Sequence, residues 1–256
     1  MSYHQRAALD AYLLVVYNPR IMPRNLKAVF FDMGSTLSHQ EPMREDLLAQ
    51  FLNDHGSARP VQNIRQALLV SDTWWHEWTE QNPFGWRDQS LIPIMRQQYR
   101  QRFLQSLQLD DKNGLHAALE DLWNTSIMRR HTAIFPDVLP TIQALKARQL
   151  QLAIVSNWDT SLQSHCDDLG MTPLFDTIVG SSYVGYEKPD PRIFVIALER
   201  LSLQADEVLH VGDMYVSDVV GARRAGIVPV LLDRFDLQPD ADCLRVRTLD
   251  QIAALL

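Results

Sequence analysis

The sequence predicts an α/β fold in which a Rossmann-like, doubly wound parallel sheet is interrupted by an inserted α-helical unit. Two observations carry this prediction: short apolar runs that stop at polar residues, and helical patterns that alternate with those runs. Strands that are apolar at every position are covered on both faces, as the strands of a parallel sheet are. A third observation, a long stretch without such runs, predicts the insertion.

The predicted strands occur at five places in the chain: 28–31, 152–155, 177–179, 208–211 and 228–232. Helical patterns follow or separate them at 138–148, 161–169, 191–201 and 217–225. Strands and helices that alternate at this spacing are typical of a parallel sheet with helical crossovers.

Between about residues 38 and 132 we expect no comparable strand. Apolar residues recur there at helical spacing instead, as at Leu47, Leu48, Phe51 and Leu52. Loop breaks are predicted at 53–60, 80–88 and 110–114, which gives a bundle of about four or five helices.

These patterns divide the chain into three parts. We assign residues 22–37 and 133–256 to the α/β core and residues 38–132 to a helical cap. Residues 1–21 are interpreted as an N-terminal extension, because Met22 opens a segment that runs directly into the first strand.

Composition narrows the class of protein. The chain has 256 residues, 46% of them hydrophobic, and 24 basic against 31 acidic residues give a net charge of −7. Such a chain lacks the basic excess that drives nucleic-acid binding, and it has no run of 18 apolar residues that would cross a membrane. The two cysteines, Cys166 and Cys243, are expected to be buried thiols in a reducing cytosol, so we predict a cytoplasmic protein without nucleic-acid or membrane partners.

Polar residues follow several predicted strands. Asp32, Ser156 with Asn157, and Asp213 stand where strands end, and Lys188 lies soon after the strand at 177–179. In a doubly wound sheet, ligands bind at the carboxyl ends of the strands, so these groups are expected to meet. A carboxylate nucleophile with a second carboxylate, a hydroxyl and an ammonium is suited to phosphoryl transfer assisted by Mg²⁺. The backbone N–H groups of the turn that begins with Met33 and Gly34 would hold the other phosphoryl oxygens.

Four segments, 31–37, 155–157, 187–191 and 210–213 with Asp218, resemble in order the four motifs of the haloacid dehalogenase superfamily. The helical insert is similar to the cap of that superfamily's subfamily I. The resemblance covers about residues 27–233 and implies a hydrolase.

The resemblance also implies roles for single residues. Asp32 would be the nucleophile, forming an aspartyl-phosphate, and a metal ligand. Lys188 would bridge Asp32 and the phosphoryl group, which Ser156 would bind. The metal would also take Asp213 and the carbonyl of Gly34, and Asp218 would be a nearby ligand or a support for Lys188 or a metal-bound water.

Gly34 departs from the superfamily's pattern, because phosphatases of this kind carry a second Asp there as general acid and base. General acid–base catalysis contributes about 10²–10⁴ in rate, so we predict a slow or selective phosphatase. His39 is the preferred substitute, and Glu41 and Arg44 are further candidates.

Two alternatives remain open. A 2-haloacid dehalogenase also lacks the second Asp, but Asp213 favours a cation site instead, since two unpaired carboxylates at close range repel each other. A non-catalytic binding protein is compatible with Gly34. The degenerate first motif is most similar to that of the DREG-2-like group.

Our interpretation is a Mg²⁺-dependent hydrolase, a phosphatase of a small phosphomonoester, that is a monomer or homodimer. Three tryptophans of the insert, Trp74, Trp75 and Trp78, are interpreted as packed cap core, with a substrate-binding wall as the alternative.

Overall fold

The computed structural model describes residues 22–23, 25–110, 114–127 and 131–256. The chain forms two compact units. The first ends at Thr36 and resumes from Pro136 to Leu256, and the second is Leu37–Phe135. The predicted N-terminal extension, residues 1–21, lies outside the described residues.

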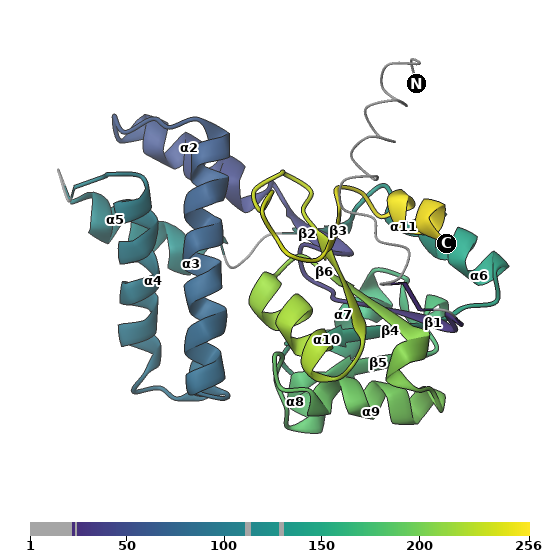
Figure 1. Ribbon diagram of the computed structural model, residues 1–256. Coiled ribbons are helices and arrows are strands. Elements are labelled where there is room, and N and C mark those ends of the chain that lie inside the picture. The colour runs from purple at the N-terminus through teal and green to yellow at the C-terminus, as the bar shows by residue number, and fades with distance from the viewer. Residues whose placement is uncertain (1–21, 24, 111–113, 128–130) are drawn as a thin grey trace, which may run out of the picture. The chain divides into compact units, whose positions relative to one another are not determined.

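The first unit is built on a six-stranded sheet with the order β5-β4-β1-β6-β7-β8, and every pair of neighbouring strands is parallel. Figure 1 labels β1, β4, β5 and β6 of this sheet. The strands are β1 (Ala28–Phe31), β4 (Gln151–Ser156), β5 (Thr177–Gly180), β6 (Val208–Gly212), β7 (Val228–Leu232) and β8 (Leu244–Val246). The chain moves outward from β1 in one direction, then returns and moves outward in the other. This is the doubly wound order, and it confirms the predicted fold class.

The helices of this unit are α6 (Val138–Ala147), α7 (Leu162–Asp168), α8 (Ser181–Val184), α9 (Arg192–Leu201), α10 (Gly221–Arg224) and α11 (Asp250–Leu255). Short 3₁₀ turns lie at Thr172–Leu174 and Ala205–Glu207, and a π-helical segment at Tyr215–Val220 precedes α10. The helix predicted at 217–225 is therefore divided between the π-helical segment and α10. Neither β8 nor α11 was predicted.

One face of the sheet is covered by α9 and α10. Side chains such as Phe30 and Val155 from the strands pack there against Phe194 of α9 and Ala222 of α10, and all four are completely buried. Right-handed crossovers place the helices that follow β5 and β6 on this face and the helices before them on the other.

The second unit contains α2 (Arg44–Asp54), α3 (Val61–Gln81), α4 (Ile92–Ser106) and α5 (Leu115–Leu122), with a 3₁₀ turn at Gly85–Arg87 and a π-helical segment at Trp123–Ile127. Its core is formed by side chains at helical spacing, among them Leu48, Leu52, Ile64 and Phe103. Of the apolar positions that the sequence analysis named, Leu48, Phe51 and Leu52 lie in this core, whereas Leu47 is only partly buried.

The expectation that no strand lies between residues 38 and 132 was wrong. The unit also holds an antiparallel pair, β2 (Ser38–Glu41) and β3 (His131–Ile134), in which Ser38 pairs with Ile134 and Glu41 with His131. A two-stranded ribbon that is partly exposed needs no apolar run, so the polar segment 38–41 carries no strand signal.

The three tryptophans of α3 stack on one another at the margin of the helical core. The Trp75 and Trp78 rings are 5.8 Å apart, and the guanidinium of Arg102 lies 4.2 Å from the centre of the Trp74 ring. All three are only half-buried, whereas the core side chains of α3 are residues such as Ile64. The prediction that they form the packed interior of the cap was therefore wrong.

Both cysteines are free and buried, as predicted. Burial raises the pKa of each thiol, of Cys166 and of Cys243, to about 11. Among the described residues, no helix is long and apolar enough to span a bilayer.

Candidate active site

The site lies at the carboxyl edge of the sheet, where β1 is flanked by β4 and β6. All three strands run in the same direction, so the residues that end them share this edge. Asp32 directly follows β1, Ser156 ends β4 and Asp213 directly follows β6. The N–H of Asp32 donates to the carbonyl of Val211 at 2.9 Å, which extends the strand pairing by one residue.

Lys188 joins two carboxylates from different elements. Its ammonium donates to Oδ1 of Asp32 and to Oδ1 of Asp218, each at 2.6 Å. The Lys188 side chain is 2% exposed and that of Asp32 is 12% exposed. A buried ammonium that is hydrogen-bonded to two carboxylates is compensated in charge and fixed in place.

Asn157 holds the backbone of Lys188. Its Oδ1 accepts from the Lys188 N–H at 2.6 Å, and its Nδ2 donates to the Lys188 carbonyl at 2.8 Å. Both the oxygen and the nitrogen of the Asn157 amide thus bond to the backbone of Lys188. Asn157 therefore fixes the position from which the Lys188 side chain enters the site.

Asp218 is surrounded by donors. Besides Lys188, His210 Nε2 lies 3.0 Å from Oδ1, and the Met214 N–H donates to Oδ2 at 3.0 Å. The Ser217 hydroxyl donates to Oδ2 at 3.5 Å. His210 is completely buried, and since its partner is a carboxylate, Nε2 carries the proton.

The electrostatics of this cluster follow from burial and charge together. Burial alone would lower the pKa of Lys188, but the adjacent Asp218 and Asp32 outweigh burial and raise it. Burial would raise the pKa of Asp218, yet Lys188 and His210 hold it well below its ordinary value. Burial lowers the pKa of His210. The cluster therefore contains a charged Lys188, an ionised Asp218 and a neutral His210 at neutral pH.

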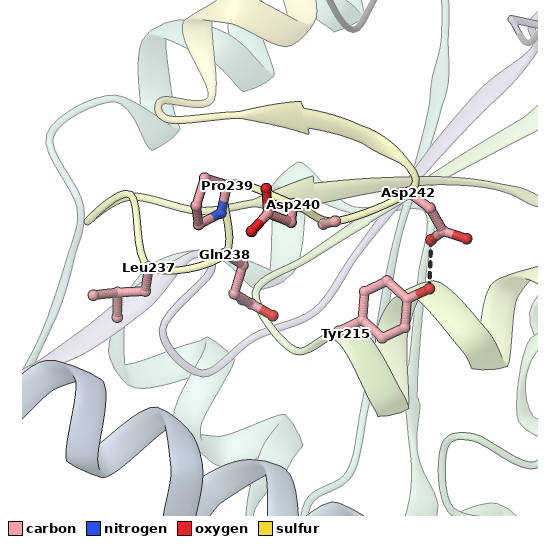
Figure 2. Close-up of a pocket in the computed structure, with 7 residues that line it drawn as sticks. Tyr215, Leu237, Gln238, Pro239, Asp240 and Asp242 are labelled. Carbon is pink, nitrogen blue, oxygen red and sulfur yellow. Dashed lines mark hydrogen bonds between the residues drawn. The ribbon is translucent and has the colours of Figure 1, made fainter.

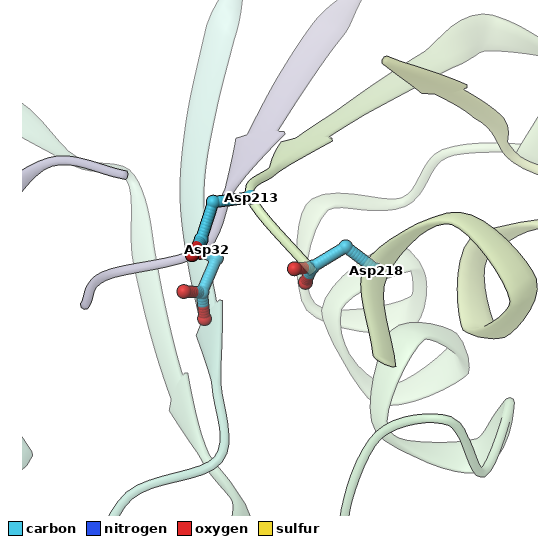
Figure 3. Close-up of side chains that lie close together, drawn as sticks. All are labelled: Asp32, Asp213 and Asp218. Carbon is cyan, nitrogen blue, oxygen red and sulfur yellow. The ribbon is translucent and has the colours of Figure 1, made fainter. Parts of the chain in front are cut away.

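Asp32, Asp213 and Asp218 offer carboxylate oxygens within 4.8 Å of one another (Figure 3). Such oxygens are the hard ligands that Mg²⁺ prefers, so the donor set fits this cation. Asp32 and Asp218 share Lys188, while Asp213 is half-buried and accepts from the Thr36 hydroxyl at 3.3 Å. Asp213 thus adds a third carboxylate to the cluster.

Gly34 borders the indole of Trp158. A Cβ atom at Gly34 would lie 3.6 Å from Cζ3 of Trp158, an ordinary contact distance. The position has room for a side chain, and that side chain would touch the indole. Met33, the preceding residue, is completely buried.

The predicted site residues thus come together, and the structure adds others that the sequence analysis left without a role. Thr36 contacts Asp213, and His210 contacts Asp218. Gly212 has no space for a side chain, because a Cβ atom there would lie 2.1 Å from Cγ of Asp218. His210 and Gly212 belong to the fourth motif, and Thr36 belongs to the first. Their place within a motif was the feature of the sequence from which a role could have been predicted.

The candidates for the missing acid belong to the second unit. His39 lies on β2, where its ring is 4.5 Å from that of Phe135 and Nε2 is 3.8 Å from Glu41 Oε1. Arg44 donates to Asp72 from both terminal nitrogens and to the Tyr99 hydroxyl at 3.1 Å. Arg44 is therefore engaged in the packing of the helical unit. His39 as the acid stays a prediction.

A cavity of about 300 Å³ lies near the site, between the segment 237–242 and Tyr215 (Figure 2). Gln238 lines it and donates from Nε2 to the carbonyl of Asp213 at 3.3 Å. Asp242, on the opposite wall, accepts from the Tyr215 hydroxyl. None of the side chains predicted for the site lines this cavity.

Comparison with solved structures identifies the fold. The chain is similar to the putative HAD-hydrolase YfnB of Bacillus subtilis bound to magnesium, with 20% identity, a TM-score of 0.61, and 91% of this chain and 99% of that chain covered. It is also similar to a HAD phosphatase of Thermococcus onnurineus, with 22% identity, a TM-score of 0.54 and coverages of 90% and 97%.

Curated relatives match over part of their length. The glyceraldehyde 3-phosphate phosphatase of Methanopyrus kandleri is 34% identical over 42% of this chain and 48% of that protein. The haloacid dehalogenase-like hydrolase domain-containing protein 3 of Bos taurus is 30% identical over 62% of this chain and 55% of that protein. The chain thus spans about half the length of these relatives, and the second is consistent with the DREG-2-like group.

A family model for haloacid dehalogenase-like hydrolases matches residues 26–226. The matched region begins before Asp32 and ends after Asp218, so it contains all the residues assembled at the sheet edge. The chain belongs to the haloacid dehalogenase-like hydrolases, as the resemblance of its motifs implied.

Proposed function

We propose that the protein is a phosphatase that hydrolyses a small phosphomonoester through an aspartyl-phosphate on Asp32. The observation that carries this proposal is the contact of Lys188 with both Asp32 and Asp218, next to the carboxylate of Asp213. Relatives that are named glyceraldehyde 3-phosphate phosphatase and ribulose-1,5-bisphosphate 5-phosphatase support the substrate class.

The geometry gives each group a task in the displacement. Asp32 attacks phosphorus with a carboxylate oxygen, forming an O–P bond while the ester oxygen departs with the electrons of the P–O bond. Lys188, charged and fixed, neutralises the phosphoryl oxygens, and Ser156 at the adjacent strand end donates to one of them. Water then attacks phosphorus, which releases phosphate and restores Asp32.

Mg²⁺, when bound, would supply positive charge that offsets the repulsion between the substrate and the carboxylates. We propose that Asp32, Asp213 and the Gly34 carbonyl hold it. Asp218 is close enough to serve as a ligand, but its oxygens already accept from Lys188, His210 and the Met214 N–H. We therefore propose that Asp218 positions Lys188, and that Asn157 does the same from the backbone side.

The experiment is to measure phosphate release from a panel of sugar phosphates, 4-nitrophenyl phosphate and acetyl phosphate, with Mg²⁺ and with EDTA. We expect release by the wild type with Mg²⁺, and background rates for Asp32→Asn and for wild type in EDTA. Asp213→Asn should lose most of the response to Mg²⁺. Asp206→Asn, which alters an exposed carboxylate elsewhere in the same unit, is the matched control and should retain wild-type activity.

Equal rates for the wild type and Asp32→Asn on every substrate would refute the enzymatic proposal. Chloride release from 2-chloropropionate without phosphate release from any ester would favour the dehalogenase alternative instead.

A further inference from the structure

The indole of Trp158 stands beside the turn that holds Asp32. Trp158 follows β4 by two residues, and β4 is the neighbour of β1 in the sheet. Its Cζ3 lies 3.6 Å from the position that a Cβ atom would take on Gly34. Trp158 is half-buried, so part of the residue is accessible to solvent.

Trp158 is held in this place by its main chain and by its ring. The hydroxyl of Ser181, which is completely buried, accepts from the Trp158 N–H and donates to the Trp158 carbonyl, each at 3.1 Å. Its Nε1 donates to the Ser161 hydroxyl at 3.2 Å, and the ring of His165 lies 4.8 Å from the indole. An aromatic ring that is fixed in this way loses little conformational entropy when a ligand packs against it.

The groups on the Lys188 side of the Asp32 carboxylate are buried. Lys188 and Asp218 are each 2% exposed and His210 is completely buried. Gly34 is half-buried and Ser35 is exposed. We therefore expect a substrate whose phosphoryl group is bound at Asp32 to extend past Gly34, where it would meet the indole.

We propose that Trp158 is a specificity-determining residue that selects phosphomonoesters with a flat, apolar leaving group of low basicity, such as an aryl or enol oxyanion. This proposal rests on the phosphatase function proposed above. Gly34 has no side chain that could protonate the departing oxygen, so the reaction favours esters whose P–O electron pair leaves on an oxygen that is stable as an anion. A flat ring attached to that oxygen packs against the indole and is withdrawn from water.

The test compares two substrates that share a good leaving group but differ in shape. 4-Nitrophenyl phosphate carries an aromatic ring, and acetyl phosphate does not. The readout is the ratio of kcat/KM for the aryl substrate to kcat/KM for acetyl phosphate. In Trp158→Ala we expect this ratio to fall about tenfold, which corresponds to about 1.4 kcal/mol, because the aryl ring loses the apolar surface against which it packs. Trp158→Phe should restore most of the ratio.

Tyr183→Ala is the matched control. Tyr183 is 52% exposed and donates to the carbonyl of Thr160 in the same region, so its loss should leave the ratio at the wild-type value. An equal fall in both kcat/KM values in Trp158→Ala, or an unchanged ratio, would overturn the proposal. Failure of the phosphatase function itself looks different, because then Asp32→Asn and wild type would hydrolyse acetyl phosphate at the same rate.

Discussion

At the scale of single residues, Gly212 and Gly34 show opposite demands at the same edge of the sheet. A Cβ atom on Gly212 would lie 2.1 Å from Cγ and 2.4 Å from Oδ2 of Asp218, so a side chain there must displace that carboxylate. The corresponding atom on Gly34 would meet the Trp158 indole at 3.6 Å, where it fits. Close packing against Asp218 therefore requires a glycine at position 212, whereas packing does not require one at position 34.

Gly212→Ala should therefore damage both folding and catalysis. Displacing Asp218 removes a support of Lys188, so we expect kcat to fall about 10²-fold. Overpacking of this kind costs about 1–3 kcal/mol in the free energy of unfolding. Gly34→Ala, measured alongside by thermal unfolding and phosphate release, should keep the wild-type Tm. If the Tm and kcat of Gly212→Ala both equal those of the wild type, the close packing of Asp218 is not what orders Lys188.

Gly34→Asp should restore a proton donor where the first motif lacks one. The gain should be greatest for alkyl phosphates, whose leaving oxygen needs a proton, and we expect about a 10²-fold rise in kcat/KM for these esters. Gly34→Asn has nearly the same shape but no acidic proton, and it should show no gain. Equal rates for the Asp and Asn variants would mean that the missing carboxyl group does not limit the reaction.

At the scale of elements, Asp137 joins parts of the first unit that are distant in sequence. Its carboxylate accepts from Arg234 at 2.7 and 3.1 Å and from the N–H of Leu249, just before α11, at 2.9 Å. Arg234 also donates to the carbonyl of Thr36, in the turn that follows Asp32, at 2.8 Å. This network ties α6 and α11 to the turn at the site.

The stability from this network should depend on pH. Burial alone would raise the pKa of Asp137, but the hydrogen bonds from Arg234 and Leu249 outweigh it and lower the pKa. A carboxyl group whose pKa is lower in the folded state stabilises the fold at pH values above its unfolded-state pKa of about 3.9. This stabilisation disappears as the pH falls through the folded-state pKa. Asp137→Asn should thus cost about 1–2 kcal/mol at pH 7.

Urea unfolding of wild type and Asp137→Asn between pH 7 and about pH 3 measures this effect. The difference between them should shrink as the pH falls below about 5, whereas Asp206→Asn should match the wild type throughout. A difference that stays constant across the whole range would show that the charge of Asp137 contributes nothing.

Elements were predictable from the sequence where burial imposes a pattern. β1, β4 and β6 are apolar because both faces are covered, and the core face of α3 carries Ile64 and Leu68 at helical spacing. β8 is only three residues long and contains Arg245, and β2 is polar, so neither carries such a pattern. Strands that depend on their pairing partner rather than on burial were missed for this reason.

At the scale of the whole molecule, the sequence predicted the edge of the sheet where the site residues meet, but not how they contact one another. Motif order indicated Asp32, Lys188 and Asp213. The resemblance left open whether Asp218 is a metal ligand or a support for Lys188. The contacts of Asp218 and the position of Trp158 beside Gly34 depend on side-chain placement that linear spacing does not encode. The net charge of −7 includes the three carboxylates of this site, and a bound cation would offset part of that charge.

The central claim is that Asp32 carries the phosphoryl group during turnover. The most direct test is to mix the protein with Mg²⁺ and 4-nitrophenyl phosphate, quench with acid during steady-state turnover, and map the modified peptide by mass spectrometry. The account predicts one phosphoryl group on Asp32 of the wild type and none on the Asp32→Asn variant. Steady release of phosphate by the wild type without any phosphoryl group on Asp32, or with undiminished release by Asp32→Asn, would contradict it.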